Sequence, residues 1–200
     1  MKINIAILGS TGSIGENILD IVRKDKKNLK VVLLTANKNY KKLIQQANEF
    51  KVKNILIYND KYYEFLKVKL KGRKINIFSR KTKLNKIFKK KVDYTICGIS
   101  GLDGLKPTLD VIKFTKTIAS ANKESIICGW NLINKKLKKY NTKFIPIDSE
   151  HYSIWNLTRE YSNNDIEEII LTASGGPLLN SPIRIQKTVT PEKTVRHPKW

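Results

Sequence analysis

The stretch Gly9-Ser10-Thr11-Gly12-Ser13-Ile14-Gly15 decides the fold of this chain. It follows the apolar run Ile3–Leu8, which predicts a buried strand, and it opens a segment with helical spacing. In such a unit the first glycine allows a tight turn, the second lets the backbone approach a pyrophosphate, and the third lets helix and strand pack closely. The spacing is GxxGxxG and not the common GxGxxG, so the strand before and the helix after carry the prediction. A glycine turn that binds nothing is the alternative.

Short apolar runs alternate with longer helical segments along most of the chain, and this alternation predicts a parallel sheet. The expected fold is α/β, a Rossmann-type doubly wound parallel sheet over residues 1–148. The helical segments between the runs include Asn39–Phe50, Asp60–Leu70 and Leu102–Lys113. The expected strands are Ile3–Leu8, Val31–Thr35, Asn54–Tyr58, Ile75–Phe78, Val92–Cys97, Thr117–Ser120 and Phe144–Ile147.

The pattern changes after Ile147. Ser149–Tyr161 predicts a helix, and Glu168–Ser174 predicts a strand that ends at Gly175-Gly176-Pro177. We therefore expect residues 149–200 to be the beginning of an α+β catalytic domain that binds metal and substrate, and we expect that domain to be incomplete here.

Composition excludes several classes of protein. No apolar run approaches the roughly 18 residues that predict a membrane-spanning helix, and the first residues lack a signal-peptide pattern. We expect a cytoplasmic, bacterial protein with no membrane partner. Cys97 and Cys128 are too few for a disulfide framework or a zinc site, and both are expected to be small buried apolar residues.

The formal net charge of +22 suggests attraction to nucleic acid. However, the lysines are spread over nearly the whole chain beside many asparagines and isoleucines, as an A/T-rich genome would produce. We therefore expect salt-sensitive, non-specific adhesion but no specific nucleic-acid partner. A basic nucleic-acid-binding module is kept as an alternative.

The end of the second expected strand decides which dinucleotide fits. NAD sites usually place an acidic residue there to bind the ribose 2′-hydroxyl. Here the sequence is Ala36-Asn37-Lys38-Asn39, without an acid. A lysine between two amides suits a 2′-phosphate, so NADP is favoured, while a solvated Lys38 is the competing interpretation.

Three further polar clusters follow expected strands or turns, and doubly wound sheets bind ligands at the carboxyl ends of their strands. The first is Ala121-Asn122-Lys123-Glu124-Ser125. The second is Pro146-Ile147-Asp148-Ser149-Glu150-His151, where two carboxylates are close enough to share a hard divalent cation. Asp148 as a helix cap is the alternative. The third is Thr172-Ala173-Ser174-Gly175-Gly176-Pro177, which suits either an anion or a plain turn.

The motifs GSTGSIG, ANKES, PIDSEH, TASGGP and RHPKW, in this order, resemble those of the 1-deoxy-D-xylulose 5-phosphate reductoisomerases of the non-mevalonate isoprenoid pathway. The resemblance extends from Ile5 to Trp200. It implies conversion of a sugar phosphate, 1-deoxy-D-xylulose 5-phosphate, to 2-C-methyl-D-erythritol 4-phosphate with NADPH and Mg²⁺, Mn²⁺ or Co²⁺, by a homodimer. Leu178 and Tyr152 depart from the usual pattern.

The family motif that follows HPxW is absent, so the chain is expected to lack part of the active site, and to bind NADPH without turning over substrate alone. The resemblance assigns the catalytic residues to Lys123, Asp148 and Glu150, and the metal ligands to Asp148 and Glu150. It assigns NADPH contacts to Thr11, Gly12, Ser13, Ile14, Asn37, Lys38, Asn39, Asn122 and Glu124. It assigns substrate contacts to Lys123, Ser149, Glu150, Ser174 and His197.

Another NADP-dependent dehydrogenase, acting on a small aldehyde or semialdehyde, is the main alternative. It would explain the phosphate loop, but it would not explain Ser149-Glu150-His151 and would usually need no metal.

Overall fold

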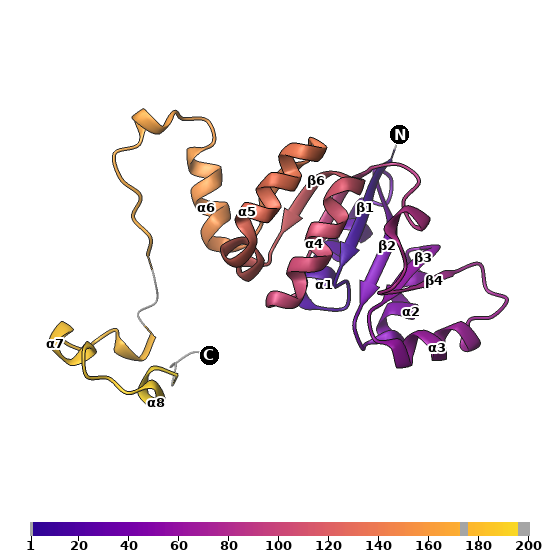
Figure 1. Ribbon diagram of the computed structural model, residues 1–200, viewed down its shortest axis with the longest axis horizontal. Coiled ribbons are helices and arrows are strands. Elements are labelled where there is room, and N and C mark those ends of the chain that lie inside the picture. The colour runs from indigo at the N-terminus through magenta and orange to yellow at the C-terminus, as the bar shows by residue number, and fades with distance from the viewer. Residues whose placement is uncertain (1, 173–175, 196–200) are drawn as a thin grey trace. The chain divides into compact units, whose positions relative to one another are not determined.

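A computed structural model of the protein describes residues 2–172 and 176–195 (Figure 1). The chain divides into two compact units, Met1–Asn156 and Leu157–Trp200. The expected boundary between residues 148 and 149 stays a prediction. Among the described helices, none has the length and apolar character needed to cross a membrane.

The first unit contains a seven-stranded sheet in the order β4-β3-β2-β1-β5-β6-β7, and all neighbouring strands are parallel. The chain therefore builds outward from β1 in one direction and then returns to build from its other side. The α/β doubly wound prediction is confirmed, and the expected strand ends differ from the observed ones by at most two residues. The strands are β1 Ile3–Leu8, β2 Leu29–Ala36, β3 Asn54–Ile57, β4 Asn76–Ser79, β5 Val92–Cys97, β6 Thr115–Ser120 and β7 Lys143–Pro146.

Both faces of the sheet are buried, which explains why its strands are continuous apolar runs without alternation. Ile5 and Ile7 of β1 belong to one core cluster, and Ala6 and Leu8 belong to the other. This division follows from the two-residue repeat of side chains along a strand. The first cluster includes residues of α1, α2 and α3, whereas the second includes residues of α4 and α5.

Asparagine side chains cap the amino ends of several helices in this unit. Asn39 accepts a hydrogen bond from the Lys42 N–H at the start of α2, and Asn59 and Asn122 do the same for α3 and α5. These caps fix where the helices start, a few residues after the strands end.

The helices are α1 Ser13–Lys24, α2 Tyr40–Glu49, α3 Asp60–Lys69, α4 Leu105–Val111, α5 Lys123–Tyr140 and α6 Ser149–Thr158, with 3-10 turns η1 Leu84–Lys86, η2 Leu102–Gly104 and η3 Ile112–Phe114.

In the second unit, the expected strand Glu168–Ser174 is wrong over its described part. Residues 168–172 have no regular secondary structure, and Ile169, Ile170 and Leu171 are more than half exposed. Apolar β-branched residues form a stable strand only when a partner strand pairs with them, and the described residues of this unit offer none. The elements of this unit are η4 Asn163–Asp165, η5 Gly176–Leu178, α7 Ile183–Gln186 and α8 Pro191–Thr194.

The prediction that both cysteines are buried is correct for Cys97 and wrong for Cys128. Cys128 lies on α5, whose buried positions include Ile126, Gly129 and Ile133, so the helical repeat turns Cys128 toward solvent.

We expect one cysteine to react quickly with a thiol reagent in the folded protein, and two to react after unfolding. Burial raises the pKa of the Cys97 thiol to about 12, so Cys97 stays protonated near neutral pH as well as inaccessible. A colorimetric thiol titration with and without denaturant measures this, and Cys128→Ser should remove the fast reaction. Two equally fast thiols in the folded protein would contradict the burial of Cys97.

Candidate active site

The loop from Gly9 to Gly12 joins β1 to α1, and close contacts require glycine at positions 9 and 15. Gly9 has a φ of +81°, in the left-handed region, and a Cβ there would lie 2.9 Å from the Gly98 carbonyl oxygen. A Cβ on Gly15 would lie 2.5 Å from both the Cα and the carbonyl oxygen of Ser10. A Cβ on Gly12 would have no close contact with the protein, since its nearest neighbour would be Gly9 O at 3.6 Å.

The amino end of α1 is suited to an anion. Gly12 is the N-cap residue, and among the described residues no side chain caps this helix. The N–H groups of the first turn are therefore available to a ligand, where the helix dipole favours negative charge.

A cavity of about 960 Å³ opens at this edge of the sheet, at the carboxyl ends of β1, β2, β3 and β5. The position between β1 and β5 is where the strand order reverses, as expected for a nucleotide site. Of the predicted cofactor residues, Thr11, Gly12 and Asn37 line the cavity. The predicted contacts Ser13, Ile14, Lys38, Asn39, Asn122 and Glu124 lie outside its lining.

Two walls of this cavity were missed by the sequence analysis. One wall follows β4 and includes Arg80 and Lys81, and the other follows β5 and includes Gly98, Ile99 and Ser100. The available signal was position, because both segments directly follow expected strands. Arg80 also forms an ion pair with Asp60 at 2.8 Å, so part of its charge is already balanced.

Lys38 is exposed at the end of β2, and among the described residues it forms no ion pair. Its carbonyl accepts a hydrogen bond from the Tyr40 N–H at 2.8 Å, which fixes the backbone at the start of α2. An unpaired ammonium group beside Asn37 is compatible with the predicted 2′-phosphate contact.

Asn122 is buried and its side chain is fully used inside the protein. Its Oδ1 accepts the Ser125 N–H at 2.6 Å, and its Nδ2 donates to the carbonyls of Gly101 at 2.7 Å and Ile99. Asn122 thus ties the loop after β6 to the loop that lines the cofactor cavity. Glu124, in the first turn of α5, is exposed. Their predicted contacts with NADPH stay predictions.

The structure brings Lys123, Ser149 and Glu150 together, although Lys123 and Glu150 lie 27 positions apart in the sequence. Lys123 Nζ donates to Glu150 Oε1 at 2.9 Å, and Ser149 Oγ donates to Glu150 Oε2 at 2.8 Å. The hydrogen bond from Lys123, supported by that from Ser149, lowers the pKa of Glu150 to about 2, and the same ion pair raises the pKa of Lys123. Because both side chains are exposed, the pair adds little to stability, and its effect is to hold opposite charges at the site.

Asp148 is buried at the end of β7 and makes two kinds of contact. Its Oδ1 accepts the His151 N–H at 3.2 Å and lies 2.6 Å from His151 Nδ1, so the helix-cap interpretation of Asp148 is correct for this oxygen. Its Oδ2 is buried without a hydrogen-bond partner among the described residues. A buried carboxylate oxygen without a partner is costly, so one oxygen caps α6 while the other is available to a ligand.

This donor set fits a hard divalent cation. Asp148 Oδ2 and the Glu150 carboxylate would supply oxygen ligands, the kind that Mg²⁺ and Mn²⁺ prefer. In residues 2–172 and 176–195, no group of three or more His, Cys, Asp or Glu side chains is arranged to hold a metal ion. A cation here would need further oxygens, from water, from substrate or from other parts of the protein. Ser174 and His197, the predicted phosphate-side contacts, lie outside the described residues.

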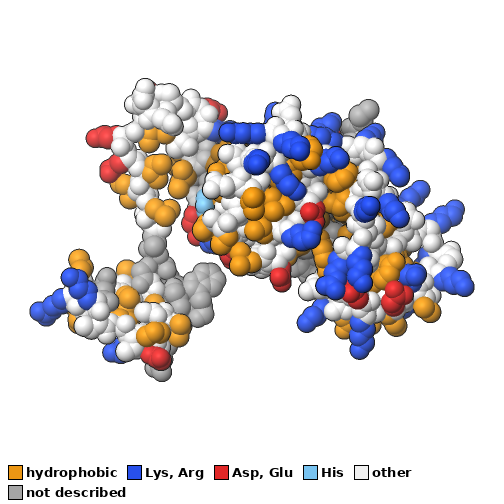
Figure 2. Space-filling view, viewed as in Figure 1, with side chains coloured by type: hydrophobic (Ala, Val, Ile, Leu, Met, Phe, Trp, Pro, Cys, Tyr) orange, Lys and Arg blue, Asp and Glu red, His pale blue; other side chains and the backbone are white. Residues whose placement is uncertain are grey.

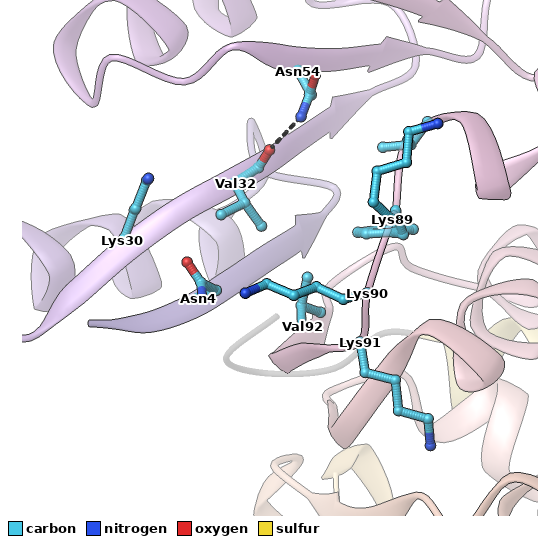
Figure 3. A pocket seen from close by; sticks show the side chains of 10 residues that line it. Asn4, Lys30, Val32, Asn54, Lys89, Lys90, Lys91 and Val92 are labelled. Atoms are coloured by element: carbon cyan, nitrogen blue, oxygen red, sulfur yellow. Dashed lines mark hydrogen bonds between the residues drawn. The ribbon is translucent and has the colours of Figure 1, made fainter. Parts of the chain in front are cut away.

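A second cavity, of about 310 Å³, lies at the opposite edge of the sheet and contains none of the predicted site residues. Figure 3 shows Asn4, Lys30 and Asn54 near the amino ends of β1, β2 and β3, with the Lys90 side chain extending toward Asn4. In the face shown in Figure 2, lysine and arginine side chains are scattered over the first unit without forming one stripe. The carboxyl edge is therefore the candidate active site.

Comparisons with known families identify relatives of the whole chain. Residues 5–129 match the family described as 1-deoxy-D-xylulose 5-phosphate reductoisomerase, and residues 144–200 match the C-terminal domain of the same enzyme. A reductoisomerase of that name from Pelagibacter ubique is 54% identical over 198 residues, covering 98% of this chain and 51% of the relative. One from Wolbachia pipientis of Culex pipiens is 40% identical over 199 residues, covering 98% and 50%. The chain spans about half the length of the curated relatives it matches.

Solved structures show the same likeness. The reductoisomerase of Zymomonas mobilis in complex with NADPH has a TM-score of 0.83 and 34% identity, covering 99% of this chain and 52% of that one. A reductoisomerase in complex with NADPH, fosmidomycin and magnesium has a TM-score of 0.79 and 32% identity, with coverage of 99% and 52%.

Proposed function

The chain belongs to the 1-deoxy-D-xylulose 5-phosphate reductoisomerase family, and from this premise we propose that it acts in the NADPH- and metal-dependent conversion of 1-deoxy-D-xylulose 5-phosphate to 2-C-methyl-D-erythritol 4-phosphate. The observation that carries the proposal is the buried Asp148 Oδ2, which has no hydrogen-bond partner among the described residues and lies at the same edge of the sheet as the glycine loop. A dinucleotide loop alone would fit many dehydrogenases, whereas a carboxylate oxygen available to a cation fits this family.

In this proposal, some residues of the chain bind the cofactor and others bind the cation. When bound, NADPH supplies the hydride and Mg²⁺, Mn²⁺ or Co²⁺ polarises the substrate oxygens. Thr11 and the first turn of α1 hold the pyrophosphate, and Asn37 and Lys38 receive the 2′-phosphate. Asp148 and Glu150 hold the cation.

Lys123 has a separate role in this proposal. Its ammonium group is held beside Glu150 at 2.9 Å, and it neutralises negative charge on the bound sugar phosphate. Ser149 also contacts the substrate, and Ser174 and His197 serve its phosphate side. We further propose that the complete enzyme is a cytoplasmic homodimer.

An NADPH-oxidation assay of the complete gene product tests this function. We expect loss of NADPH absorbance that requires both 1-deoxy-D-xylulose 5-phosphate and a divalent cation such as Mn²⁺. Full activity after removal of the cation by a chelator would instead favour a metal-independent dehydrogenase.

Lys38→Ala is expected to weaken NADPH binding about tenfold or more, because a charge-assisted hydrogen bond contributes roughly 1.5–3 kcal/mol. NADH binding should change little, since NADH lacks the 2′-phosphate. Fluorescence titration of both cofactors measures the difference.

Lys30→Ala is the matched control for Lys38→Ala. Lys30 is also exposed and lies near the start of β2, the strand that Lys38 follows, but it lines the cavity at the opposite edge of the sheet. The control should bind NADPH normally. An equal loss of affinity for NADPH and NADH in Lys38→Ala would show that Lys38 does not bind the 2′-phosphate.

A further inference from the structure

We propose that Gln46 is a positioning residue that holds the phosphate loop in the shape required by the cofactor pyrophosphate. This inference rests on the proposed NADPH function and deepens it. Gln46 lies on α2, far from the glycine motif in sequence, and only 3% of its surface is exposed.

Gln46 and Ser10 form a reciprocal pair of hydrogen bonds. Ser10 Oγ donates to Gln46 Oε1 at 2.8 Å, and Gln46 Nε2 donates to the Ser10 carbonyl oxygen at 2.9 Å. Ser10 is fully buried in the middle of the loop. The Gln46 amide therefore fixes both the side chain and the backbone of Ser10. Because the groups are buried, losing these hydrogen bonds would destabilise the loop.

Thr35, at the end of β2, supports the loop from a second direction. Its carbonyl accepts the Ser10 N–H at 2.8 Å, and its Oγ1 accepts the Gly9 N–H at 3.0 Å. The N–H groups of Gly9 and Ser10 are thus directed inward to the protein. The Thr11 N–H donates to no group in the described part of the chain, and Thr11 lines the cofactor cavity. The buried bonds therefore set where the free donors of the loop lie.

An amide at position 46 meets requirements that similar side chains would not. Gln46 Nε2 also donates to the Glu16 carboxylate, which lies 3.4 Å from Lys42 Nζ. A glutamate at position 46 would lose the donor to Ser10 and would place a second carboxylate beside Glu16. Methionine has a similar length but neither hydrogen-bonding group.

The proposed 2′-phosphate segment, residues 37–39, directly precedes the same helix. Asn39 caps α2 by accepting the Lys42 N–H at 3.2 Å, and it lies about two turns before Gln46. Gln46 should therefore influence the pyrophosphate position while the start of the helix, fixed by its own cap, keeps its place. This separation gives the inference a specific test.

The test compares Gln46→Met with Gln45→Met, which changes an exposed glutamine next to it on α2. NADPH and adenosine 2′-monophosphate are each titrated, because the second ligand contains the 2′-phosphate but no pyrophosphate. We expect Gln46→Met to bind NADPH roughly tenfold more weakly, with its affinity for adenosine 2′-monophosphate unchanged. Gln45→Met should bind both ligands normally.

Amide hydrogen exchange of the free protein gives a readout that needs no cofactor. The Gly9 and Ser10 amides should exchange faster in Gln46→Met than in Gln45→Met. If Gln46→Met does not fold, Ser10→Ala replaces it in the test, because it removes the donor to Gln46 Oε1 with little change in volume. Ser10→Ala should also lower the affinity for NADPH.

Unchanged NADPH affinity in Gln46→Met overturns the proposal, and so does an equal loss of both ligands, which would indicate general damage to α2. Unchanged exchange of the Gly9 and Ser10 amides also overturns it. If the unmodified protein binds no NADPH, both the proposed function and the cofactor role of Gln46 are wrong. If the unmodified protein binds NADPH and Gln46→Met binds it equally well, only the positioning role of Gln46 is wrong.

Discussion

Asp148→Asn is expected to lower the affinity for a divalent cation by roughly 10- to 100-fold or more, because changes to groups that merely support metal ligands already cost that much. The substitution removes the negative charge of the buried side chain whose Oδ2 has no hydrogen-bond partner in the described part of the chain. NADPH affinity should remain nearly unchanged, since Asp148 follows β7 while the glycine loop follows β1.

Asparagine is a suitable replacement because its carbonyl oxygen can still accept the His151 N–H that Asp148 Oδ1 accepts. The start of α6 is thereby kept, and thermal unfolding should show only a small change. Calorimetric titration with Mn²⁺ measures the cation affinity.

Asp165→Asn is a matched control for Asp148→Asn, because Asp165 also accepts a backbone N–H at a helix start, that of Ser162 at 3.0 Å, but is exposed. It should leave Mn²⁺ affinity unchanged. Equal Mn²⁺ affinities for Asp148→Asn and the unmodified protein would mean that Asp148 is a helix cap only.

Gly15→Ala is expected to lower the free energy of unfolding by about 1–3 kcal/mol or more, the range for inserting a methyl group into a closely packed interior. The new Cβ would lie 2.5 Å from two backbone atoms of Ser10 and 2.6 Å from Gly9 O. These atoms belong to the loop itself, so relief of the clash must move the phosphate site. NADPH binding should be lost together with stability, although alanine has the higher helix propensity.

Gly12→Ala separates packing from binding. Its Cβ would have only Gly9 O nearby, at 3.6 Å, so denaturant unfolding should be close to that of the unmodified protein. NADPH affinity should still fall, because the methyl group occupies the side from which the pyrophosphate approaches the backbone. Denaturant titration and NADPH titration of both variants measure these effects. A Gly15→Ala protein with unchanged stability would show that α1 can move away from Ser10 without cost.

Much of the candidate site follows strand ends, and this is why sequence could indicate it. Thr11, Gly12 and Asn37 line the observed cavity, and Lys123 contacts Glu150. In a parallel sheet the carboxyl ends of all strands meet at one edge, so residues distant in sequence are brought together once the strands are known. Partners within that edge still depend on side-chain packing, which the sequence analysis could not supply for Arg80, Lys81 or Gln46.

The sequence by itself determined the doubly wound sheet, because strands buried on both faces are continuous apolar runs that end at polar or glycine residues. It also determined where the phosphate loop lies, since glycines at positions 9, 12 and 15 follow an expected strand and open an expected helix. Tertiary structure alone decided whether an apolar segment pairs, as the unpaired residues 168–172 show. It alone decided that Asp148 caps α6 with one oxygen while the other has no hydrogen-bond partner in the described part of the chain, and that Gln46 holds Ser10. These contacts join residues through packing and hydrogen bonds that no local period of the sequence encodes.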